Sequence, residues 1–329
     1  MPQAISDRAK AVSPDHRQGQ KLQFVPILGR SHKQPPYELL RQETLNLVQV
    51  TEISQSGSVP ELQVVSNLDV RVFLMDGQEL VGAKQNRILN TDVLVPAKST
   101  VKIPVSCVEQ GRWRHVSQSF HSGKSASHRT RSAKLARVHQ NLKSAGHHDA
   151  DQGAVWGEVE MSLKSSGASS PTSALSDAYA NRDVALRDFR SSLKLPSGAV
   201  GVAVFHGEKF QGLDLFDRHS TLKYFWDSLV DSYAIDLLEA PVDPAQPASD
   251  AGQVIRSILD HAIAGKWDSF DSPGEGKEWR MEDKEFAAAS LVWNDKVVIH
   301  LQVFPKQATV GSDEQTPSFR PRIRRRYGR

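Results

Sequence analysis

Short runs of alternating apolar and polar residues fill the first third of the chain, and each run predicts a β-strand. Turn-forming Asn, Asp, Ser and Gly residues separate the runs. Such a series is typical of a small sandwich or a barrel-like sheet. Pro104 would place the last strand at an edge or a bulge, because proline donates no ladder hydrogen bond. The predicted strands are residues 45–50, 62–65, 70–74, 93–95 and 101–103.

Later in the chain, hairpin patterns alternate with helical patterns. Apolar residues spaced by three and four after Ser220 predict a helix to Leu237, and Asp250 caps another that ends at Gly265. A further helical pattern covers 175–189. Two strand patterns interrupted by short polar turns predict hairpins, 199–205 with 210–216 and 286–293 with 296–304. We therefore predict an α+β fold, with a short-stranded β-sandwich or barrel-like sheet in the N-terminal half and two further hairpins and amphipathic helices packed on it.

The pattern also divides the chain. Residues 1–35 lack a sustained period and predict a disordered or loosely ordered extension, and 307–329 predict a disordered basic tail. Between them, 36–306 form a single α+β domain with a basic, His-rich insertion at 114–148. Apolar residues of a helical pattern at 129–143 form only a narrow stripe, so we expect that helix at the periphery or ordered by a partner.

Composition indicates a globular protein, with 39% hydrophobic and 24% charged residues. The single cysteine excludes an internal disulfide and fits a reducing cytoplasm. We find neither a signal-peptide core nor a run of about 18 apolar residues, so we expect a cytoplasmic location and no membrane partner.

The net charge of +3 hides an uneven distribution. Eight Lys and Arg and six His occur between Gln110 and His148 without one acidic residue, and six Arg occur in 320–329. Basic segments can contact polyanions, but few aromatic residues accompany these, so we do not expect nucleic acid as a partner. For 110–148 the alternative is a mobile cationic lid over an anionic ligand.

Two polar loops flank the apolar run from Val93 to Val105 and carry the candidate chemistry. Carboxylates, amides and guanidinium groups together can accept from ribose hydroxyls, read a base edge and clamp a phosphate. The alternative is a turn held by its own side-chain hydrogen bonds. We predict Glu79 or Glu109 as the general base. The predicted ligand contacts in these loops are Gln85, Asn86, Arg87, Asn90, Arg112 and Trp113.

The loops also carry a resemblance. DGQELVGAKQNRILN (76–90) and IPVSCVEQGRW (103–113) resemble the motifs of the ADP-ribosylglycohydrolase- and rhodanese-phosphatase-associated protein domain family, over most of Leu45 to Phe304. The resemblance implies an α+β domain associated with ADP-ribose or NAD-derived nucleotide metabolism. We therefore expect a protein that binds or processes a small nucleotide-type anionic ligand. The alternative is a non-catalytic sensor or scaffold that uses its basic segment for partner or polyanion contact.

Asp214 and Asp217 are a second pair of carboxylates, which could divide acid and base roles or hold a divalent cation. Asp217 more simply caps the helix that follows, whereas for Asp214 we keep ligand binding. The histidine spacings at 115–148 match no standard zinc pair. A divalent cation is thus the one cofactor we consider.

Cys107 precedes Arg112 by five positions, so a cation-activated nucleophile and a packed thiol are both conceivable. Period-two alternation places it on the face of Ile103 and Val105, which are apolar. We predict a buried, unreactive thiol, because burial raises a thiol's pKa.

Overall fold

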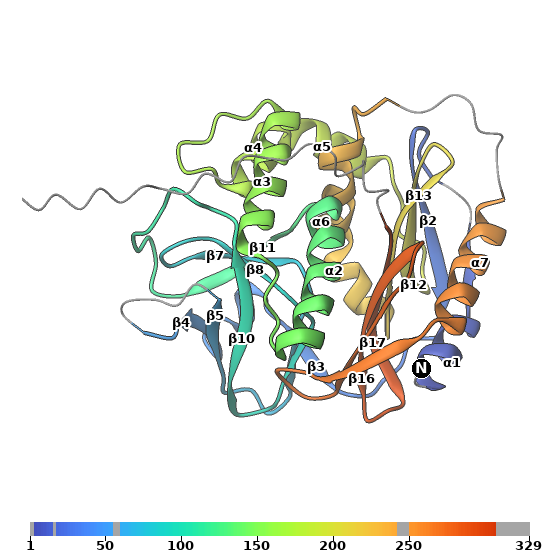
Figure 1. The fold of residues 1–329 in the computed structure, drawn as a ribbon, viewed down its shortest axis with the longest axis horizontal. Coiled ribbons are helices and arrows are strands. Elements are labelled where there is room, and N and C mark those ends of the chain that lie inside the picture. Colours follow the sequence, from blue (N-terminus) through green and yellow to red (C-terminus); the bar gives the residue numbers. More distant parts are fainter. Residues whose placement is uncertain (1–2, 16–17, 55–59, 242–249, 307–329) are drawn as a thin grey trace, which may run out of the picture.

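The computed structural model describes residues 3–15, 18–54, 60–241 and 250–306. Its largest sheet is antiparallel and has eight strands (Figure 1). Strands from both ends of the chain build it, so residues far apart in sequence become neighbours. In spatial order they are β1 (Val12–Pro14), β2 (Leu22–Gly29), β12 (Ala199–His206), β13 (Lys209–Phe216), β17 (Val297–Pro305), β16 (Phe286–Trp293), β15 (Lys277–Glu282) and β14 (Trp267–Asp271).

Six strands close into a barrel, as the short alternating runs of the N-terminal half predict. The barrel interior is filled by aliphatic side chains such as Val50, Val64 and Leu80. Its strands, in order, are β10 (Ser99–Cys107), β5 (Glu61–Ser66), β4 (Val48–Glu52), β11 (Phe120–Ser125), β7 (Gln78–Gly82) and β8 (Arg87–Leu89). A three-stranded sheet beside it consists of β3 (Tyr37–Leu39), β6 (Arg71–Leu74) and β9 (Val93–Val95).

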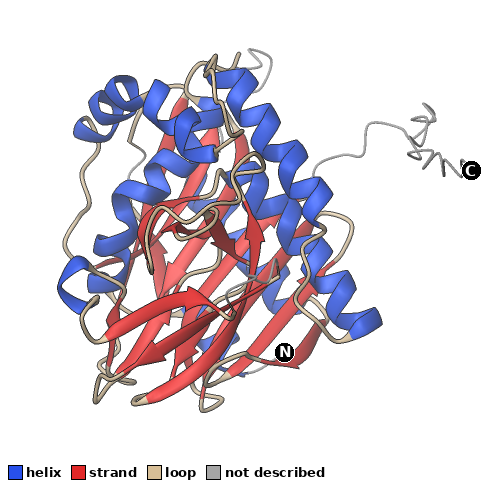
Figure 2. Cartoon of the chain, turned by 90° about the vertical axis from the view of Figure 1, so that its left-hand side faces the viewer, coloured by secondary structure: helices blue, strands red, loops and turns tan. Residues whose placement is uncertain are grey.

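Helices cover both faces of the eight-stranded sheet. In Figure 1, α2 (His128–Ala145) and α6 (His219–Leu237) lie between the barrel and the sheet, and α1 (Gln3–Lys10) and α7 (Ala251–Ala264) cover the opposite face. The turned view in Figure 2 shows helices along the flanks and upper side of the strands. Because both faces are covered, β12 alternates between two cores: its residues Val202 and Val204 belong to one, and Ala203 and Phe205 to the other.

The remaining helices are α3 (Gln152–Ser166), α4 (Leu175–Asn181), α5 (Asp183–Ser191) and the short 3-10 helix η1 (Gln42–Thr44). The predicted helix at 175–189 is therefore two consecutive helices, whereas the helices at 219–237 and 251–264 and both C-terminal hairpins are confirmed. Within the described ranges, none of the helices combines the length and the apolar character needed to span a bilayer.

The N-terminal segment differs from the predicted loose extension. Residues 3–10 form α1, and β2 pairs with both β1 and β12. Because both faces of β2 are buried, the strand is a nearly continuous apolar run with little alternation. The prediction for 307–329 lies outside the described residues.

The basic segment 114–148 also differs from the prediction, because it supplies β11 and the centrally packed α2. Arg131 and Lys134 are buried on α2 and pair with Asp214 and Asp76. Two inward-facing positions of the helix are thus cationic, which narrows its apolar stripe. Seven of the eight Lys and Arg between Gln110 and His148 pair with carboxylates, so a mobile cationic lid is wrong.

Candidate functional site

The first polar loop of the sequence is a tight hairpin. Strands β7 and β8 pair through Glu79↔Ile88 and Leu80↔Arg87, and residues 83–86 connect them. The second loop follows β10, which pairs with β8 through Cys107↔Arg87. Both motifs therefore lie at the same end of the barrel, and they touch: the backbone N–H of Asn86 donates to Glu109 Oε2 at 3.2 Å. The two loops thus meet at this end of the barrel.

Glu109 and Arg112 hold this contact together. Arg112 Nη2 lies 2.6 Å from Glu109 Oε2 and 3.0 Å from Asn86 Oδ1, and Arg112 Nη1 donates to the carbonyl of Ala83 at 2.7 Å. Thr172 Oγ1 donates to Glu109 Oε1 at 2.9 Å. Burial would raise the pKa of Glu109, but the bonds from Arg112, Asn86 and Thr172 outweigh it and lower the pKa. In this structure, the two side chains clamp the turn.

Glu79 is placed differently, because it faces away from the barrel interior, which receives its neighbour Leu80. Glu79 Oε1 accepts from Asn86 Nδ2 at 3.3 Å. Burial raises the pKa of Glu79 to about 7, with the nearby Glu109 charge adding to this and the Asn86 hydrogen bond opposing it. The side chain also lines a cavity of about 460 Å³, together with Lys124, Tyr179 and Asp183. Glu79 thus joins the motif cluster to a space that can hold a ligand.

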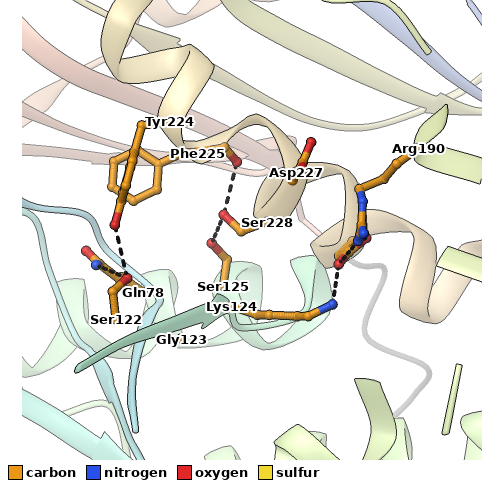
Figure 3. Close-up of a pocket in the computed structure, with 11 residues that line it drawn as sticks. Gln78, Ser122, Gly123, Lys124, Ser125, Arg190, Tyr224, Phe225, Asp227 and Ser228 are labelled. Atoms are coloured by element: carbon orange, nitrogen blue, oxygen red, sulfur yellow. Dashed lines mark hydrogen bonds and ion pairs between the residues drawn. The ribbon is translucent and has the colours of Figure 1, made fainter. Parts of the chain in front are cut away.

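A second cavity, of about 310 Å³, adjoins the first and shares Gly123 and Lys124 with it (Figure 3). Lys124 Nζ lies 2.6 Å from Asp231 Oδ2, and Arg190 Nη1 lies 2.6 Å from Asp231 Oδ1. Two cations therefore share one buried carboxylate. Figure 3 also shows the polar side chains that line this cavity from β11 and α6, Ser122, Ser125, Tyr224 and Ser228.

Gly123 lets β11 approach β7 at this point. A Cβ atom there would lie 2.6 Å from Val81 Cγ2 and 3.0 Å from Glu79 Oε2. A side chain at 123 would press on Glu79 and fill the junction between the cavities. The sequence did not indicate Lys124, Arg190 and Asp231 as a group, because they come from β11, α5 and α6. The Gly123–Lys124 pair beside the motif region is the signal that could have drawn attention to them.

Arg87, Gln85, Cys107 and Trp113 form a neighbouring group. Arg87 Nη1 donates to Gln85 Oε1 at 2.6 Å and to Cys107 Sγ at 2.7 Å, and the Trp113 ring centroid lies 5.6 Å from Arg87 Cζ. Cys107 is buried as predicted, and its pKa is raised, first by burial and also by the charge of Glu52, against the opposing effect of Arg87. The guanidinium contact was not expected on a face predicted to be apolar.

Asn90 and Asp214 lie apart from this group. Asn90 accepts from Ser106 Oγ at 2.9 Å and donates to the carbonyl of His148 at 2.9 Å. Asp214 is completely buried and pairs with Arg131 and His300. Although burial favours its neutral form, these cations hold the pKa of Asp214 well below its usual range.

His300 extends the Asp214 pair into a larger buried network. Its Nδ1 lies 2.9 Å from Asp92 Oδ2, and Asp92 Oδ1 accepts the backbone N–H of Asp76 at 2.8 Å. Burial would lower the pKa of His300, but Asp92 and Asp214 raise it to about 9. Asp214 therefore belongs to an ionic network inside the fold, apart from the two loops, and its role as a ligand contact stays a prediction.

The second aspartate, Asp217, does not cap α6, contrary to the prediction. The residue before α6 is Arg218, which has no capping side-chain bond, and Asp217 instead accepts from Tyr37 Oη at 2.5 Å and pairs with Arg218 at 2.6 Å. In the ranges that the structure describes, no group of three or more His, Cys, Asp or Glu side chains is arranged to hold a metal ion.

These features define an α+β protein in which a small closed barrel packs, through two helices, on an eight-stranded antiparallel sheet, with a polar cavity beside the barrel. The chain belongs to the ARG and Rhodanese-Phosphatase-superfamily-associated Protein domain family, whose model matches residues 11–304. No curated protein and no solved structure matches the chain.

Proposed function

We propose that this protein binds a nucleotide-type anionic ligand, of the ADP-ribose or NAD-derived class, in the two adjoining cavities, and that Glu79 acts on it as a general acid or base. The observation that carries the proposal is the position of Glu79. Its buried side chain is held by the motif residue Asn86 and belongs to the lining of the 460 Å³ cavity, and its pKa is about 7. A group with this pKa is present in both protonation states at neutral pH, as acid–base catalysis requires.

The cavity lining supports an anionic ligand that carries hydroxyl groups. Lys124 and Arg190 meet at Asp231, so an ammonium and a guanidinium group lie side by side where a phosphate could bind. The lining also includes the carboxylates Asp227 and Asp183, of which Asp183 pairs with Arg187. Ser122, Ser125, Ser228 and Tyr224 can exchange hydrogen bonds with ribose hydroxyls. Cavities of about 310 and 460 Å³ are also within the size range of small-molecule sites.

Proton transfer by Glu79 fits the cleavage of a bond to ribose. In its acid form, Glu79 would donate a proton to the departing group as the bond to the sugar carbon breaks, and water would add to that carbon. The resulting carboxylate would then receive the proton that the water loses. The Asn86 amide, itself held by Arg112, would keep the carboxyl oriented through both steps.

A non-catalytic sensor is the second candidate, and it would use the same cavities. Its version based on the basic segment has less support, because seven of the eight cations at 110–148 are engaged in ion pairs. Such cations offer little net charge to a polyanion.

The two candidates differ in turnover. The purified protein is incubated with NAD, ADP-ribose and an ADP-ribosylated peptide, with and without Mg²⁺, while thermal unfolding reports binding and mass spectrometry reports products. An enzyme gives both signals, and a sensor gives stabilisation without product. If none of the three compounds stabilises the protein and none is converted to product, the nucleotide proposal is contradicted.

Paired variants test the assigned residues. Glu79→Gln should retain ligand stabilisation while its turnover falls at least about 100-fold, as expected when a general acid–base group is removed. Lys124→Met should weaken binding itself. The matched controls are Glu160→Gln and Lys143→Met, at exposed positions outside both cavities, and they should behave like the unaltered protein.

A further inference from the structure

At one end of the barrel, the rows of inward-facing residues change from apolar to charged. On β4, Val48 and Val50 are followed at the next inward position by Glu52. On the antiparallel strands β8 and β10, Leu89 pairs with Val105, and the next inward-facing pair toward this end of the barrel is Arg87 with Cys107. A barrel of this size fills its interior with apolar side chains, so charged residues at its mouth require a separate explanation.

The two charges at this mouth are not satisfied by each other. The Glu52 side chain is 5% exposed and that of Arg87 is 0% exposed, and Arg87 Nη2 lies 3.9 Å from Glu52 Oε1. That separation is too long for a hydrogen bond. Among the described residues, neither oxygen of Glu52 has a hydrogen-bond partner, and Nε and Nη2 of Arg87 have none either. Leaving buried charged groups unbonded is costly, so these atoms are open to hydrogen bonds from a bound molecule.

Neighbouring residues orient Arg87 and cover it. Gln85 Oε1 and Cys107 Sγ both accept from Arg87 Nη1, which leaves Nε and Nη2 for other acceptors. The Trp113 ring lies over the guanidinium, Lys84 Nζ is 5.4 Å from the centroid of the same ring, and the residue is 49% exposed. An aromatic ring at this position offers a flat surface against which a second ring can stack.

We propose that the barrel mouth is a binding site for a planar ring that carries an amide-like edge, with a hydrogen-bond acceptor next to a donor. The acceptor would face the free N–H groups of Arg87, the donor would face Glu52, and the ring would stack on Trp113. A pyridine carboxamide and the edge of a guanine base share this chemistry. Carboxylates and guanidinium groups are the natural partners of such edges, since each supplies only acceptors or only donors.

This site is distinct from the cavity beside Glu79. Arg87 and Leu80, paired across β7 and β8, project into the barrel, whereas Glu79 projects outward. The inference therefore does not rest on the proposed function, and either could fail without the other.

The test is a fluorescence titration of the full chain with nicotinamide, with guanosine, and with nicotinate as a ligand that offers only acceptors at its carboxylate. Nicotinamide or guanosine should quench a signal that Trp113→Phe removes, and whichever binds identifies the type of ring. Glu52→Gln should weaken that ligand about tenfold, through loss of a charge-assisted hydrogen bond. Nicotinate should bind Glu52→Gln more tightly than the unaltered protein, because the variant lacks the Glu52 carboxylate that repels the carboxylate of nicotinate.

Two results would overturn the proposal. One is the absence of any Trp113-dependent signal with both nicotinamide and guanosine. The other is equal affinity of Glu52→Gln and the unaltered protein for the ligand that binds. Thermal unfolding of each variant establishes that it is folded, and if Glu52→Gln is not, Arg87→Lys replaces it, because lysine keeps the charge but loses the planar pair of donors.

Discussion

Replacing Asp214 with asparagine tests whether this residue serves the fold or a ligand. The amide keeps the shape of the carboxyl group but removes its charge. Four donor atoms from three residues converge on the carboxylate: Arg131 Nη1 at 3.2 Å together with Arg131 Nη2, the Tyr233 hydroxyl at 3.2 Å and His300 Nε2 at 3.1 Å. In Asp214→Asn, one acceptor atom becomes an NH₂ group that faces these donors, and Arg131 is left buried without a counter-ion at this position.

The expected loss follows from the complete burial of the pair. Removing one partner of a buried ion pair typically destabilises a protein by about 3–5 kcal/mol. His300 retains Asp92, which limits the effect on the histidine, but no second carboxylate contacts Arg131 among the ion pairs of the described residues. Since domains are stable by only about 5–15 kcal/mol, Asp214→Asn should lose a large fraction of its free energy of unfolding.

Urea unfolding at pH 7, followed by tryptophan fluorescence, measures this loss. The matched control is Asp260→Asn, the same chemical change at an exposed position of α7, which should alter stability by less than about 0.5 kcal/mol. A loss below about 1 kcal/mol for Asp214→Asn would refute the structural role. If Asp214→Asn keeps full stability but no longer responds to ligand, the result would support a ligand-binding role of Asp214.

Further predictions concern pH and the thiol. Because the pKa of Glu79 is about 7 in the folded protein against an ordinary 4.5, its contribution to stability is present below about pH 4.5 and lost as pH rises through 7. The free energy of unfolding should therefore differ less between pH 5 and pH 7.5 in Glu79→Gln than in the unaltered protein. An equal difference in the two proteins would contradict this. The His300 pKa of about 9 implies a contribution that is complete below about pH 6.5 and lost as pH rises through 9, so His300→Gln should flatten the fall in stability between pH 7 and 9.5. Native Cys107 should react with iodoacetamide much more slowly at pH 7 than the urea-unfolded chain, and Cys107→Ser should keep the ligand response; fast alkylation that ligand blocks would indicate a nucleophile.

Elements with a local cause could be predicted from the sequence. Helix α6 repeats apolar residues such as Leu222, Phe225 and Leu229 at helical spacing, and the turn Asn294–Asp295 marks the last hairpin with both residues at positive φ. Helix α2 was misplaced because Arg131 and Lys134 count as polar in any pattern, although their partners bury them. Strands β7 and β8 were missed for the same reason, because Gln78, Glu79 and Arg87 count as polar in any pattern although the fold buries them.

In the candidate site too, the sequence indicated the residues that lie close together in the chain but not those that only packing brings together. The sequence allowed a grouping of the motif residues Glu79, Asn86, Glu109 and Arg112, because each motif is short. In the structure, the pairing of β8 with both β7 and β10 brings the two motifs together. Asp231 offered no such signal: it is one acidic residue on a long helix, and only packing brings two cations to it. Glu52 likewise continues an alternating strand, and its isolation becomes visible only when the barrel is closed.

The pairing of β2 with β12 has a consequence for synthesis on the ribosome. Val204 pairs with Phe24, which is translated 180 residues earlier, and the whole barrel and five helices are encoded between them. The apolar β2 segment must therefore remain without its main partner until more than half of the chain has been made, and its exposed edge can recruit other chains during that interval. Such distant contacts also slow folding, since loop closure precedes any gain from pairing. We expect the yield of soluble protein to depend more on translation speed and chaperone supply than the stability of the finished fold would suggest.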